Sequence, residues 1–159
     1  MVEVRVTFDK PSWTDKVTRW SPNDMGAAEM AAVVDWEVLR RNAISVAANA
    51  YAPYSRLRVG AAALAADGRL FTGCNVENVS YGLSLCAECA VVAALCTAGG
   101  GRLVALSCTD AAGNLLMPCG RCRQVLLEHG GPELLVDHPA GARRLSELLP
   151  DAFGPDAWG

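Results

Sequence analysis

The amino-acid sequence predicts an α/β domain in which one mixed β-sheet is covered by helices. Three observations support this prediction: an amphipathic pattern that begins near residue 36, a hairpin signal at residues 67 and 68, and an apolar run that begins at residue 86. The segments that follow alternate between strand-like and helix-like patterns. The order helix, hairpin, helix, strand, helix and strand indicates one sheet with helices packed on it.

The first helix has clear signals at both ends. Asp35 is a good N-cap, and Pro53 in the segment YAPYS cannot continue a helix. Between them, apolar side chains recur at spacings of three and four residues, which is the pattern of an amphipathic helix. These side chains are Trp36, Leu39, Ala43, Val46 and Ala50.

A β-hairpin follows the helix. Asp67 and Gly68 lie between two apolar runs and predict a type I′ turn. The small side chains at 60–63 suggest that another element packs closely against the first strand.

The remaining elements follow from composition and breakers. The run CAECAVVAALCTAGG at 86–100 predicts a helix that is apolar on nearly every side and therefore faces the sheet in the core. We expect a strand at 102–110, a turn at 111–114, a short helix at 119–131 and a strand at 133–138. Ser146 is expected to cap a last turn before the tail at 151–159.

Length and charge limit the classes of protein. A chain of 159 residues suits one domain, and we assign it to 35–159, with 1–34 as an N-terminal extension of undefined order. Met25 and Met30 are each a candidate for an alternative start. The net charge of −3 argues against nucleic-acid binding, and no stretch resembles a membrane helix or a signal peptide. We therefore expect a cytoplasmic protein with no nucleic-acid or membrane partner.

Two Cys-x-x-Cys pairs are the main chemical signal, Cys86 with Cys89 and Cys119 with Cys122. In a reducing compartment, cysteines at such short spacings are more typical of metal sites than of disulfides. Both pairs lie at expected helix starts, where the helix dipole favours the thiolate form that binds zinc. Four thiolates would make a closed structural site, and three would leave a position open for chemistry.

Glu88 is the observation that favours the open site. It lies inside the first pair, at the start of a helix whose other residues are almost all apolar. A buried carboxylate is costly unless it is paired, hydrogen-bonded or close to a metal. Beside a zinc site it can carry protons, although an ordinary charge at a helix N-terminus remains the alternative.

Four segments of the chain, in order, resemble the small homotetrameric cytidine deaminases of pyrimidine salvage. They are YAPYSRLRVGAAAL, GCNVENVSYGLSLCAE, PCGRCRQVLLEHGG and LSELLPDAFG. Within them, CAE and PCGRC fit the three-cysteine form of the zinc deaminase signature. The resemblance implies a three-layer α/β fold and the hydrolysis of cytidine and 2′-deoxycytidine to uridine and 2′-deoxyuridine, with release of ammonia.

The resemblance also implies roles for individual residues. Each subunit would hold one zinc ion on Cys86, Cys119 and Cys122, with Glu88 as the proton carrier. Asn75 and Glu77 would hold the ribose, the backbone of Ala87 would bind the base, and Phe153 would reach into a neighbouring subunit's site. Without the resemblance, Asn75 and Glu77 could equally be polar residues at a strand end, and Phe153 a packing residue of the tail.

The sequence departs from the family pattern at two positions. Leu57 stands where relatives have Phe, so apolar contact with the nucleoside survives without an aromatic face. Cys89 stands where many relatives have an Arg that donates to the ligand sulfurs. Arg123 matches a family residue with this role, and we hypothesise that Arg121 supplies the missing positive charge, with an ordinary solvated arginine as the alternative.

Other functions are consistent with parts of the pattern. A non-catalytic zinc module would use all four cysteines, and a related deaminase would act on another aminated base or a cytosine-containing antibiotic. A polynucleotide deaminase is disfavoured because no basic, aromatic-rich run is present. A nucleotide is disfavoured as substrate because no Arg or Lys cluster adjoins the NVEN segment.

Overall fold

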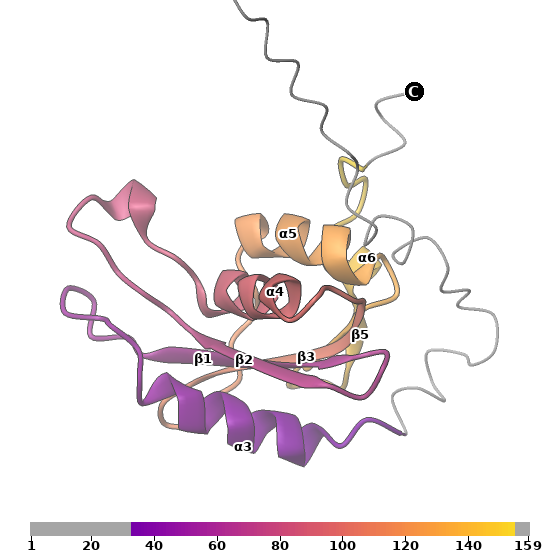
Figure 1. Ribbon diagram of the computed structural model, residues 1–159, viewed down its shortest axis with the longest axis horizontal. Helices are drawn as coiled ribbons and strands as arrows, with labels where there is room; N and C mark the ends of the chain where they lie inside the picture. The colour runs from indigo at the N-terminus through magenta and orange to yellow at the C-terminus, as the bar shows by residue number, and fades with distance from the viewer. Residues whose placement is uncertain (1–32, 155–159) are drawn as a thin grey trace, which may run out of the picture.

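A computed structural model describes residues 33–154 of the chain. It has one five-stranded sheet in the order β2-β1-β3-β4-β5. Helix α3 lies on one face of the sheet, and α4 and α5 lie on the other (Figure 1). Strand β3 runs parallel to β4, whereas the other neighbours are antiparallel. The predicted three-layer α/β architecture with a mixed sheet is therefore confirmed.

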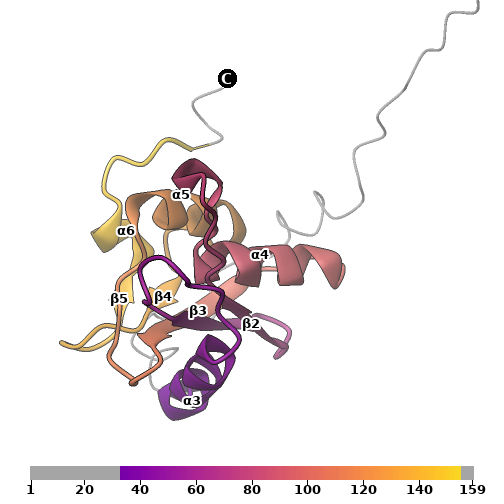
Figure 2. The same cartoon turned by 90° about the vertical axis from the view of Figure 1, so that its left-hand side faces the viewer.

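The strands are β1 (Val59–Ala65), β2 (Leu70–Cys74), β3 (Leu103–Asp110), β4 (Leu135–Val136) and β5 (Arg143–Arg144). The helices are α3 (Trp36–Ala47), α4 (Ala87–Thr97), α5 (Gly120–Gly130) and α6 (Leu145–Leu148), with a 3-10 turn, η2, at Tyr81–Leu83. Figure 2 shows α4 and α5 from the side, above the central strands.

Helix α3 begins as expected but ends early. The Asp35 carboxylate accepts the Val38 N–H at 3.0 Å, which confirms the N-cap. The buried face includes Leu39 and Ala43, which pack with residues of β1, β3 and β4. The helix ends at Ala47 rather than at Ala50, because the chain turns there to pair Tyr51 N with the Asn75 carbonyl at 3.1 Å.

The hairpin is confirmed, but its predicted type I′ turn is wrong. A type I′ turn needs positive φ at both central residues, and here Gly68 has φ 86° while Asp67 is not among the described residues with positive φ. The Gly68 N–H donates to the Ala65 carbonyl at 2.9 Å, and Ala65 N donates to the Arg69 carbonyl. These contacts indicate a three-residue loop in which Gly68 takes the left-handed position.

The small residues of β1 allow the close packing that the sequence indicated. A Cβ at Gly60 would lie 2.0 Å from the Ala43 carbonyl oxygen and 2.8 Å from Ala47 N, both on α3. Neighbouring alanines alternate between the two layers, with Ala62 facing α3 and Ala61 facing the core under α4. The sheet is therefore in tight contact with helices on both faces.

We expect Gly60→Ala to destabilise the fold by about 3 kcal/mol, because backbone atoms of α3 would have to move away from the sheet. The measurement is chemical denaturation of the variant and of Gly154→Ala, whose Cβ would meet nothing within 4 Å. Equal stability of the two variants would contradict the close contact.

Helices α4 and α5 start and stop where the sequence predicts. Cys86 and Cys119 are their N-cap residues. Gly99 and Gly100 follow α4 with φ of 94° and 77°, and Gly131 ends α5 with φ 74°. Glycine takes these left-handed conformations without steric cost.

The C-terminal part differs from expectation. Ser146 lies inside α6 and is not its cap. The N-cap is Arg144, whose N–H donates to the Glu147 carboxylate at 3.0 Å. Strand β5 and η2 were not predicted, since both are too short to show a periodic pattern.

Two further predictions concern the limits of the domain and the membrane. Most of the predicted extension at 1–34 lies outside the described residues, as does the end of the tail at 155–159. Among the residues that the structure describes, no helix is long and apolar enough to cross a membrane.

Candidate metal and substrate site

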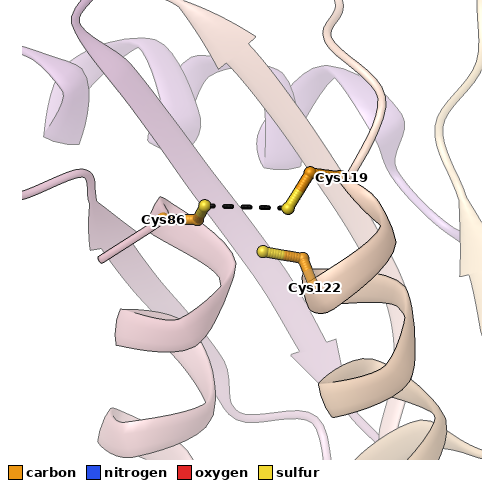
Figure 3. Close-up of side chains that lie close together, drawn as sticks. All are labelled: Cys86, Cys119 and Cys122. Atoms are coloured by element: carbon orange, nitrogen blue, oxygen red, sulfur yellow. Dashed lines mark hydrogen bonds between the residues drawn. The ribbon is translucent and has the colours of Figure 1, made fainter. Parts of the chain in front are cut away.

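Three cysteine sulfurs converge where the N-termini of α4 and α5 meet (Figure 3). The Sγ atoms of Cys86, Cys119 and Cys122 all lie within 4.8 Å of one another, and those of Cys86 and Cys119 are 3.8 Å apart. Two thiolates on a tetrahedral zinc with bonds of about 2.3 Å lie about 3.8 Å apart. The donor set and its spacing therefore fit one zinc ion.

Cys89 lies beside this cluster without joining it. Its sulfur is 4.0 Å from that of Cys122, but the group of mutually close metal-ligand atoms in the described residues contains only three cysteines. No disulfide competes with metal binding, because both cysteines are free thiols. The geometry favours three protein ligands and an open fourth position over a four-cysteine cage.

Positive charge reaches the cluster from Arg121. Its Nη2 donates to the Cys86 sulfur at 3.7 Å and to the Ser84 carbonyl at 2.9 Å. The hydrogen bond to Cys86 raises the pKa of Arg121 above its usual value. The guanidinium therefore lies against the sulfur of Cys86, where the hypothesised charge compensation would act.

Arg123 does not make the contact that the resemblance implied. Within the described part of the chain, its Nε donates to the Pro118 carbonyl at 2.8 Å and its Nη1 to the Leu148 carbonyl at 2.6 Å, not to a cysteine sulfur. It fixes the backbone that leads into Cys119 and joins it to α6. The side chain does not contact the cysteine sulfurs because it donates its hydrogen bonds to these two carbonyls.

Glu88 is buried next to the cluster. Its residue is 4% exposed, in the first turn of α4. Desolvation by burial raises the pKa of its carboxyl above the usual range. The carboxyl lines a pocket together with Cys86 and Cys119. A carboxyl that holds its proton more readily than usual is suited to passing that proton to a bound molecule.

The pocket has a volume of about 740 Å³ and is lined by residues within 54–59, 75–78, 81–88 and 116–121, together with Cys108. A volume of this size accommodates a small organic ligand. Four of the predicted substrate-binding residues line it: Leu57, Asn75, Glu77 and Ala87. The starts of α4 and α5 contribute Cys86 and Cys119 to the lining, and the NVEN segment contributes Asn75 and Glu77.

Asn75 and Glu77 already hold the pocket wall together. The Asn75 amide accepts from Val59 N at 2.8 Å and donates to the Leu57 carbonyl at 2.9 Å. The Glu77 carboxylate accepts from Tyr54 N at 2.9 Å. Each side chain keeps further hydrogen-bonding capacity, because an amide and a carboxylate have more sites than these contacts use.

Phe153 lies elsewhere. It does not line the pocket of its own chain, it is 61% exposed, and its carbonyl accepts from the Gln124 side chain at 2.7 Å.

Sequence reasoning did not assign three residues that line the pocket. Tyr54 and Tyr81 both line the pocket, with ring centroids 6.3 Å apart in an edge-on arrangement. Ser55 also lines it and donates a hydrogen bond to Glu77. Its only sequence signal was its place two residues before Leu57, where it resembles any polar turn residue.

Comparisons with known proteins agree with this site. Residues 34–137 match the family model of the cytidine and deoxycytidylate deaminase zinc-binding region. A cytidine deaminase of Mycobacterium tuberculosis is 72% identical over 123 residues, covering 77% of this chain and 92% of its own length.

Solved structures agree as well. The crystal structure of cytidine deaminase from Mycobacterium tuberculosis is 73% identical with a TM-score of 0.75, and covers 76% of this chain and 98% of its own. That from Mycobacterium leprae is 57% identical with a TM-score of 0.73, over 74% of this chain and 99% of its own.

Proposed function

This chain belongs to the cytidine and deoxycytidylate deaminase family and deaminates cytidine, and we propose that it serves pyrimidine salvage on free nucleosides. The reaction converts cytidine to uridine and 2′-deoxycytidine to 2′-deoxyuridine, with release of ammonia. The observation that supports it best is the juxtaposition of a three-cysteine zinc cluster and a buried glutamate in one pocket.

Zinc, on Cys86, Cys119 and Cys122, supplies an activated water close to neutral pH when bound. The chain's own residues do the rest. Glu88 donates a proton to N3 of the cytosine ring, takes a second proton from the attacking water, and passes it to the leaving amino group, which departs as ammonia.

Other residues that line the pocket orient the nucleoside. The Asn75 amide donates or accepts a hydrogen bond at the ribose, the Glu77 carboxylate accepts one from a ribose hydroxyl, and the backbone of Ala87 at the start of α4 binds the base. Leu57 supplies apolar contact beside the sugar and base. Holding the base at a fixed distance from Glu88 converts a bimolecular encounter into an oriented one.

Arg121 offsets part of the negative charge of three thiolates, and Arg123 acts as a support for the Cys119 turn. We expect Arg121→Ala to lower kcat about tenfold. The rise of kcat with pH should also move to higher pH, because the ligand sulfurs lose a hydrogen-bond donor. The measurement is kcat against pH, with Arg41→Ala on α3 as a matched control. An unchanged kcat and an unchanged pH profile would mean that Arg121 is an ordinary solvated arginine with no role at the metal site.

We further propose a homotetramer in which Phe153 of one subunit completes the site of another. The support is an exposed apolar rim next to the pocket, formed by Val79, Tyr81 and Leu83, which are 76%, 77% and 67% exposed. Isolated monomers rarely leave such a patch in water. Phe153→Ala should then raise the KM for cytidine, with the oligomeric state followed by light scattering.

We also propose that the enzyme is cytoplasmic and that its deaminase domain spans residues 35–159. All seven cysteines are free thiols, which suits a reducing compartment. A free nucleoside is preferred over a nucleotide because the pocket-lining residues include Arg121 but no cluster of basic side chains for a phosphate, and Arg121 is occupied by Ser84 and Cys86.

The direct test is an absorbance assay of the purified chain with cytidine and with 2′-deoxycytidine, before and after treatment with a zinc chelator. We expect turnover that the chelator removes and added zinc restores. A zinc-loaded, folded protein that converts neither nucleoside would overturn the proposed function and favour the non-catalytic zinc module.

A further inference from the structure

The loop before β1 donates hydrogen bonds to the Glu77 carboxylate from Tyr54 and Ser55. The Oε2 atom accepts two backbone hydrogen bonds, from Tyr54 N at 2.9 Å and from Ser55 N at 3.3 Å. The Oε1 atom accepts a hydrogen bond from the Ser55 hydroxyl. Three donors from two consecutive residues therefore converge on one carboxylate that lines the pocket.

This arrangement leaves the carboxylate one free position. A carboxylate offers about four lone-pair sites, two on each oxygen. Oε2 uses both of its sites on the loop, and Oε1 uses one on Ser55. The single remaining acceptor site is on Oε1, the oxygen that Ser55 holds.

The Ser55 hydroxyl is itself fixed. Its oxygen accepts the Leu57 N–H at 3.0 Å, so its hydrogen is directed at Glu77. The hydrogen bond from the Ser55 side chain is the largest of the contacts that hold the pKa of Glu77 below its usual value. The carboxylate therefore stays ionised and keeps one orientation.

The loop is held against the NVEN segment along its length. Tyr51 N donates to the Asn75 carbonyl at 3.1 Å, and Glu77 N donates to the Tyr51 carbonyl at 2.8 Å. Arg56, which lies between Ser55 and Leu57, has φ 62°. This backbone conformation costs free energy for a residue that has a side chain. The loop accepts this strain in the conformation that presents Ser55 to Glu77.

We propose that Ser55 is a positioning residue for substrate recognition, which turns the last free acceptor site of Glu77 toward one hydroxyl of the nucleoside sugar. This inference rests on the proposed function, because it assigns the sugar to the Glu77 side of the pocket. It predicts that Glu77 accepts one sugar hydroxyl and not two.

The test compares Ser55→Ala with Ser55→Thr, which keeps a hydroxyl, and with Ser45→Ala, the same chemical change at an exposed position on α3. Each is assayed with 2′-deoxycytidine and with 2′,3′-dideoxycytidine, as substrate or as competitive inhibitor. We expect Ser55→Ala to raise the KM for 2′-deoxycytidine about fivefold, because a hydrogen bond to a charged group is lost, while kcat stays within about twofold. Ser55→Thr should restore most of the affinity, and Ser45→Ala should match the wild type.

The second arm isolates Glu77. In a Glu77→Ala background, Ser55→Ala should change KM by less than about twofold, and it should have as little effect on 2′,3′-dideoxycytidine in the parent enzyme. An equal loss of affinity for both nucleosides, or in both backgrounds, would overturn the positioning role, as would an unchanged KM. Wild-type protein that is zinc-loaded but inactive on every nucleoside would instead overturn the proposed function.

Discussion

Glu88→Gln should lower kcat for cytidine by about 10²- to 10⁴-fold while leaving zinc in place. Glutamine has nearly the same shape as glutamate, so it fills the buried position at the start of α4. Its amide neither donates a proton to N3 of the base nor accepts one from water. Zinc should remain bound because the ligand cluster consists of three cysteine sulfurs and does not include Glu88.

The measurements are kcat by absorbance and zinc content by elemental analysis on the same preparation. Glu128→Gln, the same change at an exposed position of α5, is the matched control and should behave as the wild type. The thermal midpoint of Glu88→Gln should not fall, because a neutral amide costs less to bury than a carboxyl group that ionises. If Glu88→Gln retained more than a tenth of the wild-type activity, Glu88 would not be the group that transfers the proton.

Glu88 was predictable from the sequence because its signal is local. A single acidic residue lies in the first turn of a helix that is otherwise almost entirely apolar, and in the structure this residue is buried. The start of α3 and both ends of α4 and α5 were predictable for the same reason, since caps and glycines act over a few residues. The end of α3 was not, because it is set by the pairing of Tyr51 with Asn75.

The choice between Cys89 and Cys122 was not predictable from local structure. Cys86 and Cys119 are both N-caps in extended conformation, and each partner follows three residues later in a first helical turn. The two pairs are therefore locally equivalent. Only the packing of α4 against α5 brings Cys122, and not Cys89, into the cluster.

The same limit applies to the buried Asp137. It is 2% exposed and binds Arg40 of α3 through two hydrogen bonds of 2.8 Å, together with the Ser107 hydroxyl. Arg40 and Asp137 are 97 residues apart in the chain, and neither lies in a motif. The ion pair ties α3 to the end of β4, and sequence patterns do not show such a contact.

The second large effect concerns the four cysteines of the two pairs. Cys89→Ser should keep zinc and activity close to wild-type values, whereas Cys122→Ser should lose both. The reason is that Cys122 belongs to the cluster within 4.8 Å, while Cys89 only touches Cys122 at 4.0 Å. Loss of a ligand should cost more than the roughly 10- to 100-fold that loss of an outer partner costs in metal affinity.

The experiment measures zinc retention against a competing chelator, together with kcat, for Cys89→Ser, Cys122→Ser and the exposed control Cys96→Ser. If Cys89→Ser releases zinc as readily as Cys122→Ser, the metal is held by four thiolates and has no open position. Catalysis at the metal then has no place for water, and the deaminase mechanism fails with it. Zinc loss confined to Cys122→Ser would instead establish that the two pairs, alike in sequence, divide into three ligands and one neighbour.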